Sequence, residues 1–261
     1  MNIQLLGCIE VRTTSDRKIA MSHGARLLLA ALAWSPNDFV TDEVMIERVW
    51  HERAPQYPRG ALYTLATRLR KACAVAGHEG TGFLLERRRG GYVLVLDEAR
   101  VDASRFRLLA RAAKRAAHQA EDDRALRLYE EALSLWKGEP LSDVRTAWAD
   151  AARVTLRQEH REVLVGSIEL SLRLGLHEEH VTTLYALAAE LPYDEKVVGL
   201  LMLALYRSGR QHEALDCFRL FRMRMIEQLG DGPGRELCSL QERILRRDPD
   251  LRLPRALLVM G

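Results

Sequence analysis

The sequence contains no apolar run long enough to cross a membrane. Its longest such run, Val197 to Tyr206, has ten residues and is interrupted by Gly199, whereas a spanning helix needs roughly 20 apolar residues. The N-terminal segment MNIQLLGCIEVR also lacks the basic start and the long apolar centre of a signal peptide. We therefore expect no membrane segment and a cytoplasmic protein.

Cysteine and metal-ligand patterns are equally sparse. The four cysteines, at positions 8, 73, 217 and 238, show neither CxxC nor another metal-type spacing. This favours reduced, packed thiols over a disulfide framework. His177 and His180 flank two glutamates, but they are three residues apart where the HExxH zinc motif needs four. No metal site is predicted.

Motifs for catalysis are missing as well. The glycine-rich stretch 230–234 follows a predicted helix, whereas a phosphate-binding loop follows a strand. We interpret it as a turn between helices. The chain has no Walker motif, no GxSxG elbow and no Cys/His pair in a supporting context. We expect no catalytic residue, no cofactor and no enzymatic activity.

What the sequence does contain is a local concentration of positive charge. The net charge of all 261 residues is only +3. The segment from Arg59 to Tyr92 alone holds seven basic residues against Glu79 and Glu86, a net +5. The length favours two domains. The charged segment lies in the first of them.

Small strands, three helices and a hairpin are predicted for the first hundred residues. Alternating apolar residues predict a strand pair at the N-terminus, and Lys18–Met21 allows another strand. Helices are predicted at 24–34, after an N-cap at Thr41, and at 59–75. The second helix is expected to bury Val44, Ile46, Val49 and Trp50.

The third helix separates an apolar side from a polar side. Small and apolar residues recur on one side at i, i+3, i+4, i+7 spacing: Leu62, Leu65, Ala66, Leu69, Ala72 and Cys73. The other side carries Tyr63, Thr64, Thr67, Arg68 and Lys71, with Arg59 and Arg70 at its margins. We expect the first side in the core and the second in solvent.

Two strands, at 83–88 and 92–96, are predicted around a Gly90-Gly91 turn with arginines at its tip. Three helices followed by a basic hairpin is the order of a winged helix-turn-helix, an α/β fold. In that fold the third helix enters the major groove of DNA while the hairpin reaches the flanking backbone or the minor groove. The predicted DNA-binding residues are Arg59, Tyr63, Thr64, Thr67, Arg68, Arg70, Lys71, Arg87, Arg88, Arg89 and Tyr92.

Simpler interpretations of these residues stay open. The charges could form solvated faces, although three adjacent like charges at a hairpin tip repel one another. Tyr92, taken alone, fits a strand-packing aromatic as well as a phosphate contact.

The remaining chain is predicted to be almost entirely helical. Asp102 fits an N-cap, so we place the domain boundary between residues 98 and 99. We expect residues 1–100 alone to fold and to bind DNA. The second domain, 99–261, is predicted to be all-α.

Internal repetition indicates the architecture of this second domain. Residues 172–187 and 206–221 align at an offset of 34 residues, which is the tetratricopeptide period. Gly175 pairs with Gly209 in this alignment. A more divergent copy is indicated by Ala125, Tyr129 and Ala132. Helix pairs of this kind stack into a scaffold for protein contacts.

The chain resembles the SARP family, the Streptomyces antibiotic regulatory proteins, over nearly its whole length. The resemblance is carried by ALYTLATRLRKA, GGYVL, VDASRF, LWKGEPL, LMLALYRSGRQHEAL and QLGDGPGREL. It implies an OmpR-type winged helix followed by a bacterial transcriptional activation domain, in an activator of a biosynthetic gene cluster that binds direct repeats. The chain departs from the family pattern at Arg89, where glycine is more frequent, and in the segment HERAPQYP.

The resemblance implies double-stranded promoter DNA and RNA polymerase holoenzyme as partners, and leaves open binding as a dimer or in tandem. Because the segment before the third helix lies beside the DNA-reading helix in this fold, we predict a polymerase contact there, by His51, Glu52, Arg53 and Gln56. The alternative function is a tetratricopeptide interaction module whose basic N-terminal domain binds protein or single-stranded RNA. Sequence-specific duplex binding separates the two.

Overall fold

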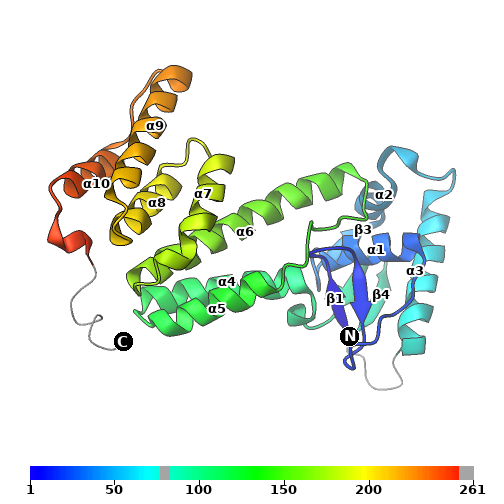
Figure 1. Ribbon diagram of the computed structural model, residues 1–261. Helices are drawn as coiled ribbons and strands as arrows, with labels where there is room; N and C mark the ends of the chain where they lie inside the picture. The colour runs from blue at the N-terminus through cyan, green and yellow to red at the C-terminus, as the bar shows by residue number, and fades with distance from the viewer. Residues whose placement is uncertain (77–82, 253–261) are drawn as a thin grey trace. The chain divides into compact units, whose positions relative to one another are not determined.

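A computed structural model describes residues 1–76 and 83–252 (Figure 1). The chain forms two compact units, Met1–Val163 and Leu164–Gly261. The division falls within helix α6 (Ala147–Arg173) and not near residue 98. In the described ranges, no helix is both long and apolar enough to span a membrane.

The first unit begins with two short antiparallel strands, β1 (Asn2–Gln4) and β2 (Glu10–Arg12). Their facing apolar side chains, Ile3 and Val11, are both buried. The further strand allowed at 18–21 is reduced to a single bridge at Lys18.

Three helices follow at the positions that the sequence predicts: α1 (His23–Ala33), α2 (Asp42–Trp50) and α3 (Pro58–Ala76). Thr41 caps α2 as predicted, because its hydroxyl accepts a hydrogen bond of 3.3 Å from the amide of Val44. This bond satisfies one of the free amides at the start of the helix.

The buried side of α2 differs from the predicted one. Met45 is buried together with Asp42 and Val49, whereas Val44 is 40% exposed. Positions 42, 45 and 49 lie on one side of a helix, and α2 packs against both α1 and α3. The neighbouring helices therefore determine which side of α2 is buried.

The wing is a three-stranded antiparallel sheet with the strand order β3–β5–β4. The hairpin of β4 (Leu84–Arg88) and β5 (Gly91–Val95) is the predicted one, whereas β3 (Phe39–Thr41) was not predicted. β3 adds to β5 with Val40 opposite Tyr92. Since β3 runs directly into α2, this pairing joins the hairpin to the start of that helix.

Helices beyond residue 101 complete the first unit. α4 (Asp102–His118) and α5 (Asp122–Ser134) lie side by side (Figure 1). The Asp102 carboxylate accepts hydrogen bonds from the amides of Leu5 and Leu6, at 2.7 and 3.0 Å. Val101, and not Asp102, occupies the N-cap position. Burial raises the pKa of Asp102 to about 6, although these amide donors act in the opposite direction.

The connection between α5 and α6 also binds the start of the chain. The amide of Lys137 donates to the carbonyl of Leu6 at 2.9 Å, and that of Leu141 donates to the carbonyl of Leu5 at 3.0 Å. The amide of Ile9 donates to the Asp143 carboxylate at 3.0 Å. The compact unit extends far beyond residue 98 because these polar groups close its N-terminal strands.

The second unit consists of the end of α6 with α7 (Val181–Glu190), α8 (Glu195–Arg207), α9 (Gln211–Leu229) and α10 (Arg235–Leu245). Both copies of the repeat contribute to one apolar core, through Leu184, Leu187, Phe218 and Phe221.

Short 3-10 turns complete the described chain at His51–Arg53, Glu98–Arg100, Glu178–His180 and Pro249–Leu251.

The turns that end α4, α6 and α8 share one conformation. Gly175 and Gly209 have φ angles of 89° and 76°, and Ala120 takes the equivalent position after α4 with a φ of 57°. The next residue in each turn donates its amide to a carbonyl five residues back: Glu121 to Ala116, Leu176 to Ser171, and Arg210 to Leu205. This shared geometry supports the assignment of α4 and α5 as an earlier copy of the repeat, and Ala125, Tyr129 and Ala132 are buried as that assignment requires.

Candidate nucleic-acid interface

Helix α3 has the two sides that its sequence predicts. Its apolar side is buried, through Leu62, Leu65, Ala66, Leu69 and Cys73. The predicted outward residues are all exposed: Tyr63, Thr64, Thr67, Arg68 and Lys71. The helix therefore presents a continuous polar stripe to solvent while its other side is sealed by the core.

Two threonine hydroxyl groups lie along this stripe. Thr64 and Thr67 each donate a hydrogen bond of 3.0 Å to the carbonyl four residues back in the helix, those of Gly60 and Tyr63. Their oxygens keep lone pairs that can accept from an incoming donor. The stripe thus combines acceptors with the cations beside them.

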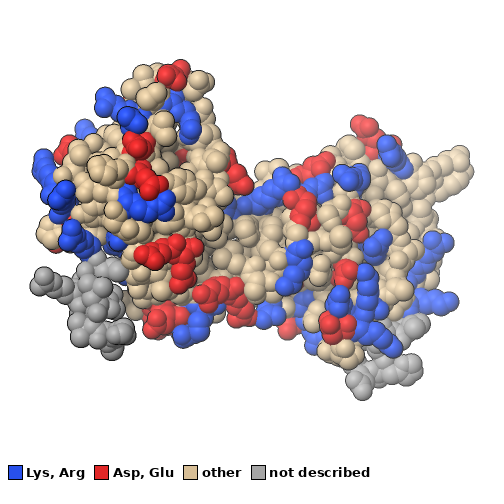
Figure 2. All heavy atoms as spheres, viewed as in Figure 1, with Lys and Arg blue, Asp and Glu red and all other residues tan. Residues whose placement is uncertain are grey.

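The two central cations of α3 are available to a ligand. Neither Arg68 nor Lys71 forms an ion pair with another residue of the ranges 1–76 and 83–252. Figure 2 shows Lys and Arg side chains along the edge of the first unit where Figure 1 draws α3. An Arg fork and a Lys point charge on an exposed helix suit base edges and phosphates.

Arg59, at the start of α3, has an exposed partner. Its guanidinium lies 2.6 Å from the Glu43 carboxylate, and both side chains are largely in solvent. Ion pairs of this kind contribute little to stability. A phosphate can therefore replace Glu43 at small cost.

Arg70 lies at the margin of α3 and is occupied by an internal contact. Its Nε and Nη2 donate to the carbonyl oxygen of Leu85, at 3.1 and 2.9 Å. This pair of bonds fixes α3 against strand β4. The structure thus gives Arg70 a positioning role in place of the expected DNA contact.

Arg87 and Tyr92 are likewise engaged by contacts within the first unit, although the Arg87 side chain is 41% exposed. Arg87 forms a bidentate pair with Asp42, whose side chain is only 4% exposed, and one of the two bonds measures 2.8 Å. The Arg87 guanidinium also stacks over the Tyr92 ring, 4.5 Å from its centroid. Tyr92 itself is 1% exposed. The DNA contact expected for Tyr92 does not fit its burial, and a phosphate at Arg87 would have to compete with Asp42 for the guanidinium.

The tip of the wing keeps two exposed arginines. Arg88 lies 2.9 Å from Glu86 in an exposed ion pair, and Arg89 has no ion pair with another described residue. The turn between them and β5 is held to α2, because the amide of Asp42 donates to the carbonyl of Gly90 at 2.8 Å. The exposed arginines of the hairpin therefore lie on a turn that is fixed to the start of α2.

The segment predicted to contact polymerase lies on the surface. Glu52, Arg53 and Gln56 are exposed, the Glu52 side chain by 88%, and His51 is partly exposed. A hydrogen bond to Glu47 raises the pKa of His51. These side chains are accessible to a second protein, as the prediction requires.

Sequence patterns did not associate the loop after β2 with α3. Arg17 and Lys18 of this loop line the same cavity as Arg68 and Lys71. The adjacent basic pair was visible in the sequence, but helical and strand periodicity relates only neighbouring positions. The tertiary fold is what brings the loop to α3.

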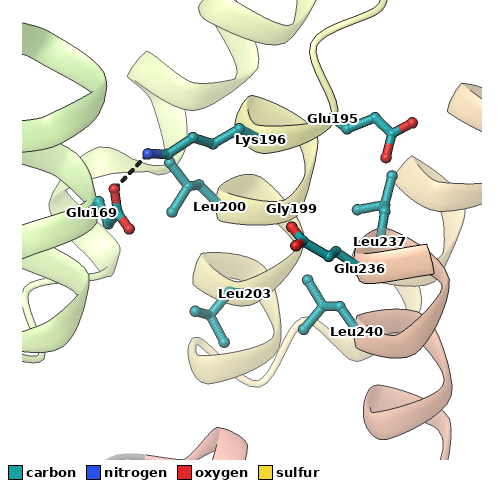
Figure 3. Close-up of a pocket in the computed structure, with 9 residues that line it drawn as sticks. All are labelled: Glu169, Glu195, Lys196, Gly199, Leu200, Leu203, Glu236, Leu237 and Leu240. Atoms are coloured by element: carbon teal, nitrogen blue, oxygen red, sulfur yellow. Dashed lines mark ion pairs between the residues drawn. The ribbon is translucent and has the colours of Figure 1, made fainter. Parts of the chain in front are cut away.

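The second unit contains a hollow of about 600 Å³ lined by residues of α6, α8 and α10 (Figure 3). Two of its acidic side chains have internal partners. Glu169 lies 2.7 Å from the Lys196 ammonium, and both oxygens of Glu195 accept from the amide of Gly234. These contacts join the helix ends around an apolar floor.

Residues 101–245 match the family model described as the bacterial transcriptional activator domain. The Streptomyces peucetius protein named Regulatory protein DnrI is 31% identical over 256 residues, which cover 96% of this chain and 94% of that protein. The chain belongs to the SARP family. The match of this SARP chain to the family model begins near the predicted boundary at residue 98, while the first compact unit ends at 163, so the boundary stays a prediction.

Longer SARP relatives contain the same region. Regulatory protein AfsR of Streptomyces coelicolor is 38% identical over 95% of this chain and 24% of that protein. AfsR of Streptomyces griseus is 34% identical over 97% of this chain and 25% of that protein. The chain therefore spans about a quarter of the length of these relatives.

A solved structure has the same fold as this SARP chain. Mycobacterium tuberculosis EmbR, in complex with a low affinity phosphopeptide, matches with a TM-score of 0.86 and 28% identity, over 95% of this chain and 65% of that chain. The predicted fold class is confirmed: a winged helix-turn-helix followed by a tetratricopeptide-like helical domain. The names of the relatives AfsR and DnrI describe them as regulatory proteins.

Proposed function

We propose that this protein is a transcriptional activator that binds double-stranded promoter DNA with sequence preference and has no enzymatic activity. The observation that carries the proposal is the outward side of α3, where Arg68 and Lys71 have no ionic partner in the described chain. An exposed helix of this kind in a winged helix-turn-helix is suited to the major groove. The names of the relatives, which are regulators, support the same function.

The two basic elements have different tasks in this proposal. Arg68, at the centre of α3, can donate two hydrogen bonds to guanine O6 and N7 and so read sequence. Arg88 and Arg89, at the wing tip, contact phosphates, which position the protein but carry no sequence information. Arg70 joins α3 to strand β4, and Arg87 joins β4 to the start of α2.

Family membership supports the choice of target. SARP regulators act on biosynthetic gene clusters, so we assign to this protein the promoter of an antibiotic or other secondary-metabolite cluster, with direct repeats as its sites. Two copies of the chain on adjacent repeats would each present α3 to one repeat. The count of bound chains per duplex, measured by analytical ultracentrifugation, distinguishes one copy from two.

Substitution of Arg68 tests the DNA contact. Duplexes selected from a random library by the full chain provide the preferred sequence, and fluorescence anisotropy measures its affinity against a scrambled duplex. We expect Arg68→Ala to cost about 1–3 kcal/mol on the preferred duplex and to relax the preference. Arg88→Ala should weaken both duplexes about equally.

Arg124→Ala is the matched control, because it removes the same charge from an exposed pair with Glu121 on the helical side of the first unit. It should leave both affinities unchanged. If the wild-type chain does not distinguish preferred from scrambled DNA, the protein- or RNA-binding alternative gains support. Full affinity and preference in Arg68→Ala would mean that another side of α3 faces DNA.

We assign the polymerase contact to the exposed segment before α3. About 1.4 kcal/mol of added contact raises the occupancy of a weakly bound promoter tenfold, so the loss of one or two polar contacts can silence activation. Replacement of Glu52 and Arg53 together by alanine should leave DNA affinity nearly unchanged and lower transcription by purified polymerase. Undiminished transcription at equal promoter occupancy would move the contact to the helical domain.

A further inference from the structure

A second basic feature lies between the loop after β2 and the outward side of α3. A cavity of about 470 Å³ opens there. The loop contributes Arg17, Lys18, Ile19 and Ala20, and α3 contributes Arg68, Lys71 and Ala72. None of the lining residues is acidic, and the walls between the basic side chains are apolar.

Most of the positive charge around this cavity is not neutralised within the described chain. The Lys18 ammonium lies 2.5 Å from Glu10, which also pairs with Arg12. Arg17, Arg68 and Lys71 have no ion pair with another residue of the ranges 1–76 and 83–252. Like charges beside apolar walls repel one another more strongly than in bulk water. A bound anion would remove this repulsion.

The loop holds Arg17 by its main chain. The amide of Arg17 donates to the Thr13 hydroxyl at 3.1 Å, and the amide of Thr13 donates to the carbonyl of Arg17 at 2.9 Å. The amide of Ile19 donates to the carbonyl of Val11 at 2.8 Å, which continues the β2 pairing. Because these bonds use backbone groups and Thr13, the Arg17 side chain is free to bind and its removal should leave the loop intact.

We propose that this cavity binds a phosphodiester group of the DNA backbone at the edge of the groove that α3 enters, with Arg17 as a phosphate contact. The inference rests on the proposed function. A phosphodiester fits because a guanidinium can hold two phosphate oxygens at once. DNA is the source that the geometry favours, since Arg68 and Lys71 belong both to this cavity and to the outward side of α3. The loop thus extends the interface beyond the helix and the wing.

The test is Arg17→Ala in the full chain, with the affinity for the preferred duplex measured over a range of salt concentrations. Each phosphate contact contributes about −0.9 to the slope of log K against log salt. We expect the substitution to weaken binding about three- to tenfold at low salt, to reduce the magnitude of the slope by about 1, and to act equally on scrambled DNA. Arg124→Ala is the control of equal charge change and should alter neither quantity.

A duplex series with single neutral methylphosphonate linkages then locates the contact. A neutral linkage at one position should weaken DNA binding by the wild-type protein but leave DNA binding by Arg17→Ala unaffected. If Arg17→Ala keeps the wild-type affinity and slope while Arg68→Ala loses affinity, this inference is wrong and the proposed function stands. If neither substitution changes the affinity, this inference is wrong and so is the assignment of the outward side of α3 to DNA.

Titration of the protein with inorganic phosphate in the absence of DNA, monitored by calorimetry, distinguishes a free phosphate ligand from a phosphodiester of DNA. Binding of phosphate that depends on Arg17, combined with unchanged DNA affinity in Arg17→Ala, would assign the cavity to a small anion and overturn the DNA contact. Weak phosphate binding together with the changed salt slope supports the phosphodiester.

Discussion

Single arginines of the first unit differ in function according to the groups that surround them. Arg70 donates to a strand carbonyl and Arg87 to a buried carboxylate, so both stabilise the fold. Arg68 and Arg89 have no ion pair in the described chain and are exposed. The same side chain is therefore a structural link where the fold supplies an acceptor, and is left available to a ligand where it does not.

Ala120 is a residue-scale weakness in the helical repeat. Its φ of 57° is left-handed, at the turn position where the other two copies have Gly175 and Gly209. A residue other than glycine in the left-handed conformation costs roughly 1–2 kcal/mol, and Ala120→Gly would remove this cost. Glycine also has greater conformational freedom in the unfolded chain, which offsets part of the gain. We expect Ala120→Gly to raise the free energy of unfolding by about 0.5–1 kcal/mol in urea denaturation. Ala112→Gly, inside α4, should lower it by about 1 kcal/mol, and a loss of stability in both variants would contradict the turn assignment.

At the scale of elements, the wing depends on the close approach of strand β5 to strand β3. A Cβ atom at Gly91 would lie 2.3 Å from the carbonyl oxygen of Val40 and 2.6 Å from the Phe39 ring. Backbone cannot move aside as a flexible side chain can, so we expect Gly91→Ala to lower the free energy of unfolding by about 3 kcal/mol. Thermal unfolding followed by circular dichroism measures this loss.

Gly90→Ala provides the neighbouring control for that substitution. Gly90 has a φ of 80°, but a Cβ atom there would meet no atom within 4 Å beyond its chain neighbours, so its replacement should cost only the left-handed conformation, roughly 1 kcal/mol. Equal losses for the two variants would show that conformation, and not contact with β3, sets the requirement for glycine. The wing would then not depend on its third strand.

At the scale of the whole molecule, the first unit needs residues from beyond the winged helix. Asp102, Lys137 and Leu141 bond to the main chain of Leu5 and Leu6, and Trp148 meets Trp34 edge to face at 6.0 Å. A fragment of residues 1–98 lacks all of these partners, and buried unpaired polar groups are costly. We therefore expect residues 1–163 to unfold cooperatively and residues 1–98 to be largely unfolded at the same temperature, as read by calorimetry. A 1–98 fragment that melts near the temperature of 1–163 would support the boundary predicted from the sequence.

The sequence by itself determined the order of the helices, the wing hairpin, the 34-residue offset and the outward stripe of α3. All of these follow from periodicity and turn residues, which relate positions close together in the chain. Tertiary structure decided which arginines stay free, which side of α2 is buried and where the first compact unit ends. Arg87 and Asp42 are 45 residues apart and Leu5 and Asp102 are 97 apart, and no local pattern records such pairings. A helical period gives the direction of a side chain, but only the folded chain supplies the acceptor that it meets.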